Sequence, residues 1–296
     1  MLEACNLGRR YRRTWALREF SVAVPAGHVV ALVGPNGAGK TTLLHLAVGL
    51  TAATKGTVRV LDGLQPGCAD ALAGIGFVAQ DAPLYRYLSV TDMLHLAGNL
   101  NRSWDAQAAS SRIASLGLPR DKKVGALSGG QQAQLALTIA LAKRPRLLIL
   151  DEPLARLDPL ARHEFMSLLM AAVAEDGLSV IFSSHVVAEL ERVADYLVVL
   201  NGGRLQVAGE VDDLLAAHRV LTGPADLAAA AAGQLNPVRS SVAGAQAHLL
   251  CRTSGPGEPV PSGFLAQPVS LEELVLAYLR DPSVVALPGP ELAVRA

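Results

Sequence analysis

The chain has 296 residues, of which 51% are hydrophobic and 18% are charged, so an intrinsically disordered protein is excluded and one large domain with a smaller appendage is expected. Lys and Arg together number 26, as do Asp and Glu, and this neutral balance argues against a nucleic-acid partner, because phosphate binding favours a basic excess. No run reaches the roughly 18 uncharged apolar residues that cross a bilayer, which predicts that the chain stays outside the membrane interior.

A local basic cluster lies near the N-terminus, at Arg9, Arg10, Arg12 and Arg13. Its four residues around one aromatic are interpreted as a solvated edge or part of a ligand site, in preference to a nucleic-acid patch. The three cysteines lie far apart in the sequence, so neither a disulfide framework nor a metal cluster is expected, and a reducing cytoplasm fits best.

The first strong pattern is a strand, a glycine-rich loop and a helix. The β-branched run Val29–Val33 predicts a buried strand that ends directly in glycine, and apolar residues recur at helical spacing between 43 and 50. The loop between them matches G-x-x-x-x-G-K-[ST], in which backbone N–H groups wrap phosphates at a helix N-terminus. The predicted nucleotide-binding residues are Gly34, Pro35, Asn36, Gly37, Ala38, Gly39, Lys40, Thr41 and Thr42.

The polar residues at the end of this loop have distinct chemical roles. Lys40 is expected to neutralise charge on the β- and γ-phosphates of a nucleotide. The Thr41 hydroxyl is a candidate ligand of Mg²⁺, because that ion prefers oxygen ligands and bridges the same two phosphates during transfer.

A mainly helical segment follows at about residues 86–145 and is interpreted as an insert in an α/β core. Ser89 and Asp92 have the spacing of a capping box, which predicts a helix start there. Further along, Ser128, Gly129, Gly130 and Gln131 precede a helix expected over residues 132–142. A serine hydroxyl and N–H groups at a helix N-terminus make a second anion site, whereas the plainer interpretation is a glycine turn that caps the helix.

Two more strands complete the expected core. The runs Leu147–Leu150 and Ser179–Ser183 flank a helix-compatible stretch over residues 160–175, and this alternation predicts a parallel sheet covered by helices. Asp151 and Glu152 follow the first of these strands directly. Asp151 is the candidate to orient Mg²⁺, and Glu152 is the candidate to polarise an attacking water; the alternative for two acids at a strand end is an ordinary surface turn.

The character of the chain changes after about residue 209, and we predict a domain boundary near residue 216. Residues 219–221 and 248–250 suggest strands, Ala228–Ala232 suggests the buried side of a short helix, and Leu271–Leu279 is amphipathic. Residues 1–215 are therefore expected to form the main domain, and residues 216–296 a small C-terminal α+β accessory domain.

The order of these motifs resembles the ATP-binding-cassette (ABC) family. The stretch Leu127–Gln131 is similar to the signature motif of that family, and the order continues through the acid pair to Asp158 and His185. The resemblance covers residues 1 to about 215. It implies an ATPase that uses ATP and Mg²⁺, and a P-loop NTPase-type parallel-sheet core with an antiparallel β edge and a helical subdomain at about 86–145.

The resemblance also implies roles for residues that carry little signal by themselves. Gln80 would contact Mg²⁺ and the attacking water, His185 the γ-phosphate, and Tyr11 would stack on adenine, while Asp158 would be the D-loop residue. Taken alone, Gln80 would be a surface glutamine, His185 a capping or structural histidine and Tyr11 a half-buried aromatic. Their place in the ordered set favours the functional interpretation. Trp15 is a second aromatic candidate for the adenine contact. The implied catalytic set is Lys40, Gln80, Glu152 and His185.

Two positions depart from the family pattern. Arg156 stands where a small residue is usual in the D-loop, and Gln132 follows the signature where a basic residue is common. Neither departure removes a catalytic group, and both bear on the interface between subunits.

For the assembly, the resemblance implies two subunits that face head to tail, so that residues 128–131 of one cover ATP on the phosphate loop of the other. A homodimer is expected, with a pair formed with a different ATPase subunit as the alternative, peripheral to the cytoplasmic face of the cell membrane and attached to a separate transmembrane permease. The segment Asp81–Thr91 is similar to bacterial exporter-type ATPases of the drug and bacteriocin-resistance group, which favours export. Two alternatives are a soluble ABC ATPase acting in translation, DNA repair or iron–sulfur assembly, and a nucleotide-binding regulatory module without turnover.

Overall fold

The computed structural model describes residues 1–280 except 82, 156, 188–189, 236 and 254–258. Arg156, in the expected main domain, lies outside the described residues. Residues 281–296, at the end of the expected accessory domain, also lie outside them. Within the described part, no helix has both the length and the apolar character needed to cross a membrane.

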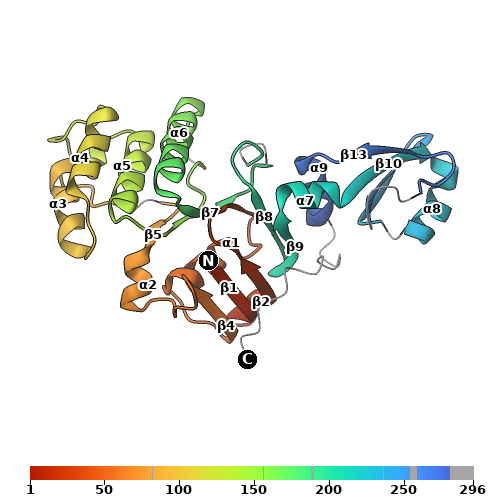
Figure 1. Cartoon of the computed structure of the whole chain (residues 1–296), viewed down its shortest axis with the longest axis horizontal. Helices are drawn as coiled ribbons and strands as arrows, with labels where there is room; N and C mark the ends of the chain where they lie inside the picture. Colours follow the sequence, from red (N-terminus) through yellow and green to blue (C-terminus); the bar gives the residue numbers. More distant parts are fainter. Residues whose placement is uncertain (82, 156, 188–189, 236, 254–258, 281–296) are drawn as a thin grey trace.

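A central six-stranded sheet organises the described residues, in the order β5-β6-β7-β3-β8-β9 (Figure 1). Neighbouring strands are parallel except β8 and β9, which are antiparallel. This arrangement confirms the predicted parallel-sheet core, since each apolar run is buried on both faces of the sheet. The strands are β3 (Val29–Val33), β5 (Ile75–Val78), β6 (Leu147–Leu150), β7 (Ser179–Ser184), β8 (Tyr196–Asn201) and β9 (Arg204–Glu210).

A three-stranded antiparallel sheet packs against one side of this core, in the order β2-β1-β4. Its strands are β1 (Leu2–Tyr11), β2 (Thr14–Val24) and β4 (Lys55–Val60), and helix α1 (Lys40–Val48) lies beside it. One buried apolar cluster joins Phe20 of this sheet, Leu44 of α1 and Ile149 of the central sheet. The cluster fixes α1, and with it the phosphate loop, between the two sheets.

Helices cover the opposite face of the central sheet and extend to one end of the molecule (Figure 1). Leu137 and Phe165 belong to the apolar cluster on this face. The predicted capping box is confirmed, because Asp92 N donates to Ser89 Oγ at 3.0 Å and Ser89 N donates to Asp92 Oδ2 at 3.3 Å. The helices of this part are α3 (Val90–Leu100), α4 (Ala106–Ser115), η1 (Val124–Ala126), α5 (Gly129–Ala142) and α6 (Pro159–Asp176). Helix α2 (Ala69–Gly74) lies on the other side, where its Ala71 belongs to the same apolar cluster as Leu44 of α1.

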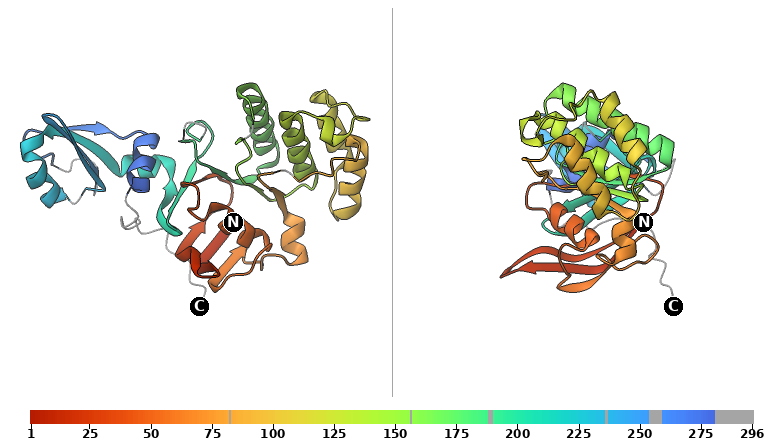
Figure 2. Two further views of the ribbon diagram at one scale, coloured as in Figure 1. Left: turned by 180° about the vertical axis from the view of Figure 1, so that it is seen from behind. Right: turned by 90° about the vertical axis from the view of Figure 1, so that its left-hand side faces the viewer.

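A four-stranded antiparallel sheet lies at the other end of the molecule, in the order β11-β12-β10-β13 (Figure 2). The two predicted strands are confirmed, and Val220 pairs with Leu250. Of the alanine run, Ala228 and Ala231 are buried, which corrects the expected buried run, because a helix on a sheet turns only one face inward. The elements are α7 (Val211–Ala216), β10 (His218–Pro224), η3 (Ala225–Leu227), α8 (Ala228–Leu235), β11 (Arg239–Ala243), β12 (Gln246–Arg252) and β13 (Leu265–Pro268).

The last described helix, α9 (Leu271–Arg280), returns to the central sheet. Asn201 Nδ2 of β8 donates to the Leu279 carbonyl oxygen at 2.6 Å. The buried Tyr278 hydroxyl lies 2.8 Å from His218 Nε2, and burial lowers the pKa of His218. A cut near residue 216 would therefore separate β8 from a helix that packs on it, and the division at residue 216 stays a prediction.

Candidate active site

The phosphate loop runs from the carboxyl end of β3 into α1. Gly39 has φ 108°, and a Cβ there would lie 2.5 Å from the Ala16 carbonyl oxygen of β2, so this position requires glycine. A Cβ on Gly34 would lie 2.4 Å from the Leu200 carbonyl oxygen of β8. Backbones on both sides therefore shape the loop, and its glycines allow that close approach.

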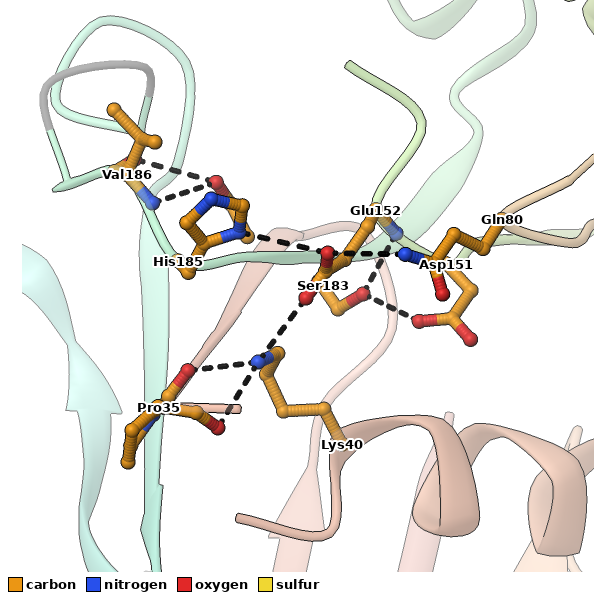
Figure 3. Close-up of polar contacts among 10 residues, drawn as sticks. Pro35, Lys40, Gln80, Asp151, Glu152, Ser183, His185 and Val186 are labelled. Atoms are coloured by element: carbon orange, nitrogen blue, oxygen red, sulfur yellow. Dashed lines mark hydrogen bonds and ion pairs between the residues drawn. The ribbon is translucent and has the colours of Figure 1, made fainter. Parts of the chain in front are cut away.

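Lys40, the first residue of α1, folds its side chain back over this loop. The side chain is 5% exposed, and Nζ donates to the carbonyl oxygens of Gly34 at 2.7 Å and Pro35 at 3.3 Å (Figure 3). Nζ also lies 3.2 Å from Glu152 Oε1. The loop lysine and the candidate base therefore meet in one ion pair.

The two acids lie where β6 ends, beside the end of β7. The Asp151 side chain is 1% exposed and accepts a hydrogen bond from Ser183 Oγ at 2.8 Å. Glu152 has φ 45°, a left-handed backbone conformation that is unusual for a residue other than glycine. Its amide donates to Ser183 Oγ at 2.8 Å, so one hydroxyl contacts both residues of the pair.

Gln80 and His185 reach the same carboxylate from two other segments. Gln80 Nε2 donates to Glu152 Oε2 at 3.4 Å, and His185 Nδ1 lies 3.5 Å from that oxygen. Lys40, Gln80, Glu152 and His185 are therefore brought together at the carboxyl ends of the central strands (Figure 3). A carboxylate held among a lysine, an amide and an imidazole is positioned for proton transfer to or from a bound water.

Ser183 was missed as a site residue from the sequence. In the sequence it is the polar end of an apolar run, and its contacts depend on a neighbouring strand that sequence spacing does not identify. The available signal is the Ser183–Ser184–His185 run, which places a hydroxyl two residues before the candidate histidine.

The candidate metal ligands are oxygen donors. Thr41 lies in the first turn of α1, next to Lys40, while Gln80 and Asp151 lie at the ends of β5 and β6. Among the described residues no group of three or more His, Cys, Asp and Glu side chains could hold a metal ion. One carboxylate, one hydroxyl and one amide oxygen fit Mg²⁺, which commonly takes one or two carboxylates together with substrate phosphates.

The aromatic candidates lie in the β1–β2 sheet. Tyr11 is 45% exposed, and the Arg9 guanidinium carbon lies 4.7 Å from its ring centroid. The Trp15 ring contacts basic side chains, with the Arg10 guanidinium carbon at 5.5 Å and Lys55 Nζ at 5.9 Å from its centroid. Tyr11 therefore presents the more exposed ring, covered on one face by a cation.

The signature residues open helix α5, which begins at Gly129 rather than at the predicted residue 132. Ser128 is the N-cap residue: its Oγ accepts from Gln131 N at 3.2 Å, and its own N donates to Gln131 Oε1 at 3.1 Å. This capping box extends the helix over both glycines and corrects the expected boundary. A Cβ on Gly130 would lie 2.8 Å from Ala161 Cβ of α6, so this glycine allows the two helices to pack closely.

Two further sequence candidates also make local backbone contacts. Asp158 caps α6, where its Oδ1 accepts from the amides of Leu160 and Ala161, each at 3.0 Å. Gln132 Nε2 donates to the Leu127 carbonyl oxygen at 3.0 Å. Both side chains therefore stabilise helix starts in this chain.

Known proteins are similar to this chain in sequence and in fold. Residues 17–155 match the family model described as ABC transporter. An uncharacterized ABC transporter ATP-binding protein, YxlF of Bacillus subtilis (strain 168), is 33% identical over 219 residues, which are 72% of each chain. The chain belongs to the ABC transporter family. It is an ATP-binding subunit of the ABC type, and cassettes of this type hydrolyse ATP to power transport.

Other ABC proteins show similar relationships. The lantibiotic transport ATP-binding protein SrtF of Streptococcus pyogenes is 32% identical over 72% of this chain and 92% of its own. The aliphatic sulfonates import ATP-binding protein SsuB of Escherichia coli (strain K12) is 37% identical over 70% of this chain and 79% of its own. A dimeric ATP-binding cassette in a post-hydrolysis state, bound to ADP and Pi, superposes with a TM-score of 0.63 at 26% identity, over 71% of this chain and 99% of its own.

Proposed function

We propose that this ABC subunit binds and hydrolyses Mg²⁺·ATP to power export through a permease that is a separate polypeptide. The observation that carries the hydrolysis part of this proposal is the convergence of Lys40, Gln80 and His185 on the Glu152 carboxylate. A simple nucleotide-binding module would not need a carboxylate held at the end of the phosphate site, whereas a hydrolase needs a base there.

Each residue has a role that follows from its position. The backbone of residues 34–42 wraps the phosphates, and Lys40 exchanges Glu152 for phosphate oxygens when ATP binds. Glu152, released from that ion pair, takes a proton from the attacking water. His185 contacts the γ-phosphate, and Gln80 helps to orient the water.

Mg²⁺ would be held by Thr41, Asp151 and Gln80, in agreement with their oxygen donors. When bound, the ion neutralises charge that develops on the β- and γ-phosphates. Asp151 supplies the negative charge of this ligand set, and the Ser183 hydroxyl orients its carboxylate. Tyr11, with its exposed ring, stacks on adenine.

The proposed assembly is a head-to-tail homodimer. Residues 128–131 of one subunit cover ATP on the phosphate loop of the other, and Asp158 lies at the shared interface. The support is that one chain carries both halves of such a composite site, and that the similar ADP- and Pi-bound cassette is a dimer. Residues 1–215 form the motor domain in this proposal, and residues 216–296 form an accessory domain.

Export is the proposed direction, at the cytoplasmic face of the cell membrane. The similarity of Asp81–Thr91 to exporter-type ATPases supports it, and so does the likeness to a lantibiotic transport protein. The likeness to a sulfonate import protein makes import the competing direction.

Expression of this gene with its genomic neighbours tests the transport assignment. We expect a tagged copy of the chain to co-purify with an integral membrane protein, and ATP hydrolysis by the pair to exceed that of the chain alone. Deletion of the gene is expected to increase cell accumulation of the cargo and sensitivity to it, because export would stop.

Recovery of the chain without any membrane protein contradicts the transport assignment. A deletion strain that accumulates less cargo contradicts export while leaving the ATPase assignment intact. The Glu152→Gln subunit is the matched control, because it should still co-purify with the permease but should not show the stimulated ATP hydrolysis.

A further inference from the structure

Ser183 lies on β7, between β6, which is followed by Asp151 and Glu152, and β3, which is followed by the phosphate loop. Strand β7 pairs with β6 on one side and β3 on the other. Leu150 pairs with Phe182, so Asp151, one residue on, lies beside Ser183. On the other side Ser183 pairs with Leu32, two residues before Gly34 begins the phosphate loop.

The buried Ser183 hydroxyl joins the two acids. Its Oγ accepts a hydrogen bond from Glu152 N at 2.8 Å and donates one to Asp151 Oδ1 at 2.8 Å (Figure 3). A hydroxyl has one hydrogen to donate, and here that hydrogen goes to a carboxylate, which makes the stronger, charge-assisted kind of bond. Ser183 is fully buried, so water has little access to replace either bond.

The bond to the Glu152 amide also supports an unfavourable backbone conformation. Glu152 has φ 45°, and a residue with a side chain persists in this region only when its surroundings hold it there. The direction in which the Glu152 side chain leaves the strand depends on this backbone. The same hydroxyl therefore influences the Asp151 carboxylate directly and the Glu152 carboxylate through the main chain.

We infer that Ser183 is a positioning residue for ATP hydrolysis, whose hydroxyl holds Asp151 and Glu152 in the orientation that turnover requires. This inference rests on the roles proposed above for those two acids. Ser183 acts through its neighbours, so its loss lowers turnover and the Mg²⁺-dependent part of nucleotide affinity while metal-free nucleotide binding persists.

The test compares Ser183→Ala with Ser179→Ala. Ser179 is a buried serine on the same strand, and its Oγ accepts from Gly27 N at 2.8 Å, so the control removes a similar bond at the opposite end of β7. We expect Ser183→Ala to lower kcat for ATP about tenfold, because two hydrogen bonds, one of them charge-assisted, are lost. Ser179→Ala should retain at least half of the wild-type kcat.

Binding of a fluorescent ATP analogue supplies a readout that does not depend on turnover. Without metal, Ser183→Ala and Ser179→Ala should bind it within about twofold of each other. Adding Mg²⁺ should increase the affinity for the analogue in both variants. This increase should be severalfold smaller for Ser183→Ala than for Ser179→Ala. Ser183→Thr, which keeps the hydroxyl, should recover most of the kcat and of this gain, and Ser183→Cys, a weaker donor of similar size, should fall between serine and alanine.

Equal kcat and equal Mg²⁺ gain in Ser183→Ala and Ser179→Ala would overturn the inference, as would a threonine variant no better than alanine. If alanine prevents folding, the cysteine variant decides, and wild-type kcat in that variant overturns the inference. Glu152→Gln is measured in parallel: full phosphate release by it overturns the proposed role of Glu152, whereas an unaffected Ser183→Ala beside an inactive Glu152→Gln overturns only the inference about Ser183.

Discussion

Glu152→Gln is expected to lower the rate of phosphate release by about 10² to 10⁴-fold, the usual contribution of a positioned general base. Glutamine nearly matches glutamate in shape, so the backbone contact from Glu152 N to Ser183 Oγ at 2.8 Å should remain. The substitution also removes the ion pair between Glu152 Oε1 and Lys40 Nζ, 3.2 Å apart. Lys40 then loses a competitor for phosphate, so ATP affinity should be unchanged or increased.

The control for this prediction is Glu175→Gln, the same change on an exposed glutamate of α6. Its turnover should equal that of the wild type. Phosphate release is measured at saturating Mg²⁺·ATP, with nucleotide affinity determined separately. Undiminished release by Glu152→Gln would remove Glu152 from the mechanism.

Lys40→Met is expected to weaken ATP binding by about 10- to 100-fold, because a charge-assisted interaction with the phosphates is lost. Methionine retains most of the length of the side chain, which matters at a position that is 5% exposed. Turnover should fall as well, since the charge that develops on the γ-phosphate is no longer neutralised. Equilibrium binding of ATP and of adenosine measures the effect, and adenosine, which lacks phosphates, should bind both proteins equally.

Lys122→Met serves as the matched control, because Lys122 is an exposed lysine in the turn before η1. It should bind ATP as the wild type does. If Lys40→Met binds ATP as tightly as this control, the loop residues 34–42 do not form the phosphate site.

Much of the core could be predicted from the sequence, because its strands are short apolar runs and its loop has a strict pattern. Val29–Val33 and Leu147–Leu150 form strands with those bounds. The order of the strands in the sheet could not be predicted, because the periodicity of a strand carries no information about its neighbours. The strand order β6-β7-β3 brings Glu152 to Lys40, and sequence spacing alone does not predict that order.

The misses have physical causes of the same kind. The role of Ser183 could not be predicted, because its partners Asp151 and Glu152 follow a different strand, and only the pairing of β6 with β7 brings them together. The start of α5 was placed too late because glycine propensity suggested a turn, whereas the capping box of Ser128 and Gln131 extends the helix over Gly129 and Gly130. The amphipathic pattern of residues 271–279 predicts a helix with one buried face, but it does not identify β8 as the strand on which α9 packs.

In the proposed composite site, ATP binds to the phosphate loop of one subunit and is covered by residues 128–131 of a second. The measurement that tests it most directly is the solution mass of Glu152→Gln protein, by light scattering, with and without ATP. A chain of 30.9 kDa should be monomeric alone and double its mass with ATP.

The decisive variant adds Ser128→Asp to the same protein. Aspartate caps a helix as well as serine does, so α5 should persist, but its charge repels the phosphate of the facing subunit. ATP should still bind to this double variant while its mass stays at that of one chain, whereas Ser128→Thr in place of Ser128→Asp should still allow the dimer. A dimer of unchanged stability with Ser128→Asp, or a monomer of Glu152→Gln with ATP bound, would contradict the composite site.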